Sequence, residues 1–141
     1  METSDLPRHR LIKNLMAKQT EKVADAAIVL WEQLATQIIS IVGEDGFNAV
    51  YLRSMFLSRS TFPGLPPAIP LPPQKGHRFA ELKISFEGQS PAQVREANSL
   101  LLITLTDILA SLIGEQLINR ILHLAWAAEI QNETGKEFKN E

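Results

Sequence analysis

The chain contains two copies of one sequence pattern, and this repeat limits the folds that are open to it. Residues 40–50 align without a gap to residues 111–121, and most of the differences between them are conservative. The identical positions are Ser40/Ser111, Gly43/Gly114, Glu44/Glu115 and Asn48/Asn119, and upstream Leu30, Leu34 and Ile38 match Leu101, Leu105 and Leu109. Such a repeat predicts two similar helical halves that pack about a pseudo-two-fold axis.

The spacing of apolar residues predicts helices on both sides of the two glycines. Apolar side chains recur every three or four positions from Val23 to Ile41, which predicts one helix over residues 10–42. Residues 47–57 are apolar on nearly every side, as in a central, buried helix. The sequence Ser90-Pro91-Ala92-Gln93 is typical of a helix start, and the helical pattern continues from there to about residue 131, interrupted at Gly114.

Two segments do not follow a helical pattern. Six of the eight prolines fall within residues 59–78, which predicts a Pro-rich crossover between the two halves. Residues 79–87 alternate between apolar and polar side chains, which predicts a short strand or extended arm. A single strand leaves backbone groups unpaired. It would therefore pair with a second subunit or with the Pro-rich segment, or else the segment is helical.

These features predict a single all-α domain over residues 1–141. It is a helical bundle of long helices, kinked or broken at Gly43 and Gly114, with a frayed N-terminus (1–10) and a polar tail (133–141). With 141 residues, 45 % of them apolar, the chain can form a sizeable core. Because the long helices carry more apolar surface than one such bundle hides, we expect a homodimer. Its interface would be the face of residues 100–113 or the 79–87 arm.

Several classes of function are disfavoured. The absence of cysteine excludes disulfides, thiolate metal sites and a cysteine nucleophile. No Glu-x-x-His, phosphate loop or Gly-x-Ser-x-Gly occurs, so we predict no enzyme, no metal and no cofactor. A net charge of −2 without a basic stripe predicts no nucleic-acid partner. The first 22 residues lack an apolar signal region, and the apolar run 100–113 is short and contains Asp107, so we expect a bacterial cytoplasmic protein with no membrane span.

The repeated polar residues are the first candidate site. Glu44 with Asn48, and Glu115 with Asn119, are each four residues apart and would share a helix face. If the halves pack about a pseudo-two-fold axis, the four side chains could converge to hold a cation or a small ligand. The favoured interpretation is structural. A glutamate near a helix N-terminus is stabilising by about 0.3–1 kcal/mol, and each Asn would bond a neighbouring helix.

Two further motifs are weaker candidates. Pro70, Pro73 and Lys75 fit the Pro-x-x-Pro-x-Lys pattern of SH3 ligands and could form an interaction arm, although a rigid crossover explains them more simply. His123 could accept a phosphoryl group, but its neighbours are Leu122 and Leu124, which favours a structural histidine.

The first functional hypothesis is therefore a non-enzymatic regulatory or protein-interaction module with a protein partner. The alternative is a small-ligand-sensing helical domain with a polar site between the two pseudo-repeats. Histidine phosphotransfer at His123 is a weaker alternative. The sequence identifies neither the partner nor the ligand.

Overall fold

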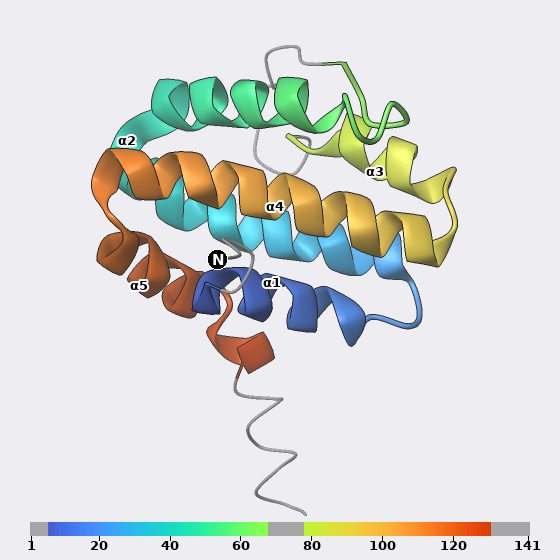
Figure 1. Cartoon of the computed structure of the whole chain (residues 1–141), viewed down its shortest axis with the longest axis horizontal. Coiled ribbons are helices and arrows are strands. Elements are labelled where there is room, and N and C mark those ends of the chain that lie inside the picture. The colour runs from blue at the N-terminus through green and yellow to red at the C-terminus, as the bar shows by residue number, and fades with distance from the viewer. Residues whose placement is uncertain (1–5, 68–77, 131–141) are drawn as a thin grey trace, which may run out of the picture.

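The computed structural model describes residues 6–67 and 78–130, and within these ranges the regular structure is all helical (Figure 1). The helices are α1 (Pro7–Ala17), α2 (Val23–Ser58), α3 (Ala80–Glu87), α4 (Pro91–Ile113) and α5 (Glu115–Ala125). Gly43 bends α2 with a φ of 85°, and Gly114 separates α4 from α5 with a φ of 98°. Both values lie in the left-handed region that favours glycine. The predicted all-α bundle and its two kinks are confirmed.

The helices form two equivalent units of three segments each. In Figure 1 the first part of α2 (residues 23–42) and α4 run in the same direction, and these two helices make the most extensive helix contact. Both kinks lie at the same end of the bundle. After each kink the chain turns back, as the second part of α2 (residues 44–58) and as α5. A shorter helix, α1 or α3, precedes each central helix and runs opposite to it.

The burial pattern supports the equivalence of the two units. Of the thirteen buried residues of α2, twelve have a buried counterpart 71 positions later in the chain. Leu30 corresponds to Leu101 and Ile38 to Leu109, for example, and all four are in the core. The repeat therefore extends beyond the identical residues to the choice of which side chains face inward.

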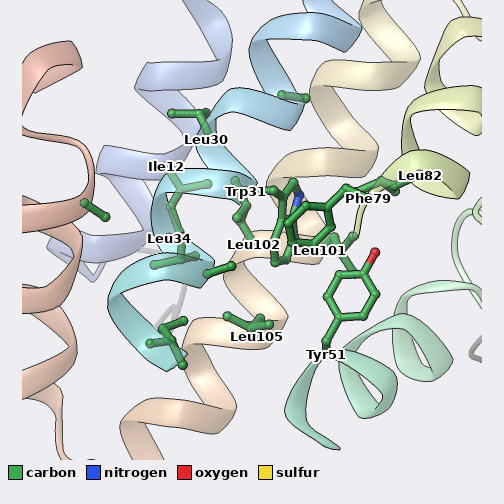
Figure 2. Close-up of a cluster of buried hydrophobic side chains, with 14 of the residues drawn as sticks. Ile12, Leu30, Trp31, Leu34, Tyr51, Phe79, Leu82, Leu101, Leu102 and Leu105 are labelled. Atoms are coloured by element: carbon green, nitrogen blue, oxygen red, sulfur yellow. The ribbon is translucent and has the colours of Figure 1, made fainter. Parts of the chain in front are cut away.

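The units exchange their first helices. The helix α1 of the first unit packs on α4 of the second, and α3 of the second unit packs on α2 of the first, while α5 contacts both central helices. Each unit thus completes the other, and a single core joins them (Figure 2).

Aromatic side chains and two buried hydrogen bonds tie this core together. The Trp31 ring lies edge-on to Tyr51 at 5.3 Å and 5.6 Å from the Phe79 ring. Its indole Nε1 donates to Asn98 Oδ1 at 2.6 Å. Trp126 Nε1 donates to the Leu30 carbonyl oxygen at 3.0 Å. Because both indole N–H groups have partners, these large side chains are buried without an unpaired donor.

The prediction of a strand or extended arm at residues 79–87 is wrong, because this segment is helix α3. Its buried side chains, Leu82 and Phe86, are four residues apart and pack on α2 as one helical face. Ile84, which the alternating pattern placed with them, is exposed.

Other boundaries also differ from the predicted ones. The helix expected over residues 10–42 is broken between Ala17 and Val23, where Lys22 has a φ of 51°. Residues 7–10 belong to α1 and are not a frayed end. The second part of α2 forms one edge of the bundle and is not a central helix. Of the Pro-rich crossover, residues 68–77 lie outside the described residues, and so does the predicted tail at 133–141.

The predictions of no membrane span and of a cytoplasmic location are overturned by the lengths of two helices. Val23–Ser58 and Pro91–Ile113 are each long and apolar enough to cross a membrane. In their most apolar 18-residue stretches, only 33 % and 39 % are buried inside the structure. The prediction considered only the apolar run 100–113, whereas the helix that contains it is Pro91–Ile113. The length of the whole helix decides whether a segment reaches across a hydrocarbon core about 30 Å thick.

The expectation of a homodimer rested on apolar surface that one chain was not expected to hide. Much of the face of residues 100–113 is in fact covered within the chain, since Leu101, Leu102, Leu105 and Leu109 belong to the core. Leu112 is the large apolar residue of this helix that stays exposed. The surface that motivated the dimer is therefore largely used inside the fold.

Candidate functional site

A buried arginine at the start of α1 connects the two units. Arg8 is only 2 % exposed. Its Nε and Nη2 atoms donate to the two carboxylate oxygens of Glu115, each at 2.9 Å. Its Nη1 atom donates to Asp107 Oδ1 at 2.5 Å and to Thr106 Oγ1 at 3.0 Å. A bidentate contact of this kind fixes geometry as well as charge.

Hydrogen bonding keeps the Arg8–Glu115 pair ionised. Burial by itself would lower the pKa of Arg8, but its hydrogen bonds to Glu115 and Asp107 raise that pKa above the ordinary value. The hydrogen bond from Arg8 in turn lowers the pKa of Glu115, although partial burial opposes the change. At neutral pH the pair is therefore a guanidinium held by a carboxylate.

His9 extends the cluster toward the surface between α1 and α4. Its Nε2 atom lies 2.7 Å from Asp107 Oδ1. Because a carboxylate only accepts hydrogen bonds, we assign the hydrogen of this contact to Nε2. The other ring nitrogen, Nδ1, is buried without a partner among the described residues. A continuous chain of contacts thus runs from Glu115 at the kink, through Arg8 and Asp107, to His9.

A second buried arginine repeats the arrangement at the other kink. Arg78, which lies just before α3, donates from Nη1 and Nη2 to the two carboxylate oxygens of Glu44 at 2.7 and 3.1 Å. This hydrogen bond lowers the pKa of Glu44. Arg8 and Arg78 are 70 positions apart, and each pairs with the glutamate that follows the kink glycine of the other unit. The repeated glutamates therefore connect the units.

The four predicted polar residues lie in two separate settings. Among the described residues, no hydrogen bond or ion pair joins Glu44 or Asn48 to Glu115 or Asn119. Asn48 Oδ1 is buried without a partner there. Asn119 borders a cavity of about 220 Å³. The arginine contacts explain why both glutamates occur, and a ligand held by all four residues stays a prediction.

Of the remaining predicted site residues, His123 lies on the surface and the other three lie outside the described residues. His123 is exposed on α5, and its Nδ1 atom lies 2.9 Å from the Asn119 carbonyl oxygen. Pro70, Pro73 and Lys75 lie outside the described residues, so the interaction arm stays a prediction. Within residues 6–67 and 78–130, no three His, Asp or Glu side chains converge as metal ligands.

A groove between α1 and α4 forms a cavity that the sequence analysis missed. Its volume is about 510 Å³. Apolar side chains line part of it, namely Met16, Ala17, Leu100 and Ile103, and polar or charged ones line the rest, namely His9, Lys13, Arg95, Glu96, Ser99 and Asp107. The α1 residues at 9, 13, 16 and 17 share one helix face. That spacing was visible in the sequence. The sequence did not show that α1 of the first unit packs on α4 of the second, which is what forms the groove.

Comparison of the chain with protein-family models, with curated proteins and with solved structures finds no match. Function is therefore argued from the groove and the surfaces of the chain itself.

Proposed function

We propose that this chain is a non-enzymatic protein-interaction module that binds an amphipathic helix of a partner protein in the groove between α1 and α4. The observation that carries the proposal is the groove itself, whose lining contains both apolar and charged side chains. Stable protein interfaces combine the same two kinds of side chain, in an apolar centre and a polar rim.

The shape of the groove favours a helix over a small molecule. All the lining residues come from α1 and α4, so the groove has two walls and is open on its outer side. From His9 to Ala17 the α1 wall is about 12 Å long at 1.5 Å per residue. This length accommodates two turns of a docked helix, with apolar anchors at positions i, i+3 or i+4, and i+7. Small molecules are usually buried on most sides.

The charged side chains of the groove lining predict the polar residues of the partner. Lys13 lies midway along α1, and Glu96 lies on α4. In the part of the chain that the structure describes, neither has an ion-pair partner. A docked helix with an acidic residue beside Lys13 and a basic residue beside Glu96 would satisfy both charges, which favours correct partners over incorrect ones.

The test is a selection of helical peptides from a displayed library on the purified chain. We expect the selected peptides to share apolar spacing of i, i+3 or i+4, and i+7. Ser99→Trp should fill the groove and abolish their binding. The matched control is Ser111→Trp, because Ser111 is exposed on the same helix and its hydroxyl bonds only its own helix. Peptides without the helical spacing, or equal binding by both variants, would refute the proposal.

A further inference from the structure

The second part of α2 lies at the edge of the bundle (Figure 1), and large apolar side chains on its outer face are exposed in the described part of the chain. Its inner face is buried in the core through Phe47, Tyr51 and Met55. On its outer face Phe56 is 64 % exposed and Leu57 is 40 % exposed. A phenylalanine is usually buried, and exposed apolar side chains beside charges mark interaction surfaces.

The same face carries positive charge without acidic neighbours in the sequence. Residues 46–80 contain four basic residues and no acidic one. The whole chain has 14 basic and 16 acidic residues, so the remainder has 10 and 16, a net charge of −6. Arg78 is buried and paired with Glu44, but Arg53 and Arg59 are exposed. The Arg53 guanidinium lies over the Phe56 ring, with its central carbon 5.9 Å from the ring centroid.

We infer that this outer face, formed by Leu52, Arg53, Phe56, Leu57 and Arg59, docks the protein on a membrane surface of anionic lipids. A helix lying at such a surface inserts Phe and Leu side chains among the headgroups and keeps arginines near the phosphates. Each arginine near an anionic surface adds attraction. Within residues 6–67 and 78–130, this face is the outer side of a single helix without a second wall, which suits a lipid surface better than a second helix.

The test measures partition of the purified full chain onto vesicles by sedimentation. The vesicles are of phosphatidylcholine alone and of phosphatidylcholine mixed in equal parts with phosphatidylglycerol. We expect binding to the mixed vesicles, weakened by added salt because surface charge attraction is screened. Phe56→Ser should lower the partition coefficient at least about tenfold, from the lost burial of apolar area. Arg53→Gln should lower it about fivefold.

The matched control is Leu124→Ser. Leu124 is 61 % exposed, nearly as much as Phe56, and lies on α5, at the other side of the bundle in Figure 1. We expect this variant to bind as the parent chain does, and circular dichroism should show all three variants folded. Equal binding to both kinds of vesicle would overturn the inference. So would undiminished binding of Phe56→Ser, or an equal loss in Leu124→Ser.

Discussion

Replacement of Glu115 by alanine tests whether the arginine–glutamate pairs hold the two units together. The change leaves Nε and Nη2 of Arg8 without their acceptors, while the arginine itself stays buried. A buried donor without a partner costs about 1–3 kcal/mol. Two such donors would set the cost at about 2–6 kcal/mol. The Glu115 side chain is 40 % exposed, so water replaces part of the lost contact. We therefore expect a loss of about 2 kcal/mol after this discount for solvent.

The assay is unfolding in urea followed by circular dichroism, together with thermal melting. A loss of this size should lower the melting temperature by about 6 °C in a chain of this length. The matched control is Glu96→Ala, because Glu96 is also an acidic residue but is exposed and has no ion-pair partner among the described residues. We expect the control to change the free energy of unfolding by less than about 0.5 kcal/mol.

A double variant separates the ion pair from other effects of the substitution. In Arg8→Met/Glu115→Ala the buried charge is absent, so no guanidinium is left unpaired. The double variant should therefore be less destabilised than the sum of the two single variants. An additive result, or a Glu115→Ala variant as stable as Glu96→Ala, would refute a structural role for this pair.

Two further predictions follow from the kinks. Gly43→Ala and Gly114→Ala should each cost about 1–2 kcal/mol from the left-handed backbone alone, because an added Cβ meets no atom within 4 Å. Gly88→Ala, at a φ of −86°, should change stability little, and equal urea midpoints for the three variants would contradict this reasoning. Because the folded pKa values of Glu44 and Glu115 are lowered, their contribution to stability is complete above the ordinary glutamate pKa of about 4.3 and is lost as pH falls through the folded values. Melting curves should show this acid loss, and a variant with glutamine at both positions should show less of it.

The local features of the fold were predictable from sequence. The helix start at Ser90 is confirmed, because Ser90 Oγ accepts from the Gln93 backbone N–H and Gln93 Oε1 accepts from the Ser90 N–H. The kinks were predictable because glycine tolerates positive φ. The error at α3 has a simple cause. Leu82 and Phe86 are four residues apart, a spacing that fits both a strand with alternating faces and one face of a helix.

The site was less predictable because its contacts are distant in the sequence. Arg8 and Glu115 are 107 positions apart, and Arg8 lies in a segment that looked frayed. The repeated glutamates were a true signal, but their partners lie in segments that show little similarity to each other. The exchange of α1 and α3 was not visible either, because amphipathic spacing shows that a helix has a buried face but not which helix covers it.

The two units have kept their buried residues and changed their surfaces. Arg8 and Arg78 show that α1 and α3 match at an offset of 70, so Lys13 and Met16 of the groove correspond to Lys83 and Phe86. The helices α2 and α4 match at an offset of 71, so Glu96 of the groove corresponds to Asp25. Lys83 and Asp25 form an ion pair at 3.3 Å across the equivalent surface between α3 and α2, whereas Lys13 and Glu96 have no ion-pair partner among the described residues. Because the core positions and both arginine–glutamate pairs are shared, the requirements of the fold do not explain this difference. A binding function carried by one of two equivalent surfaces does explain it, which favours the α1–α4 groove as the functional one.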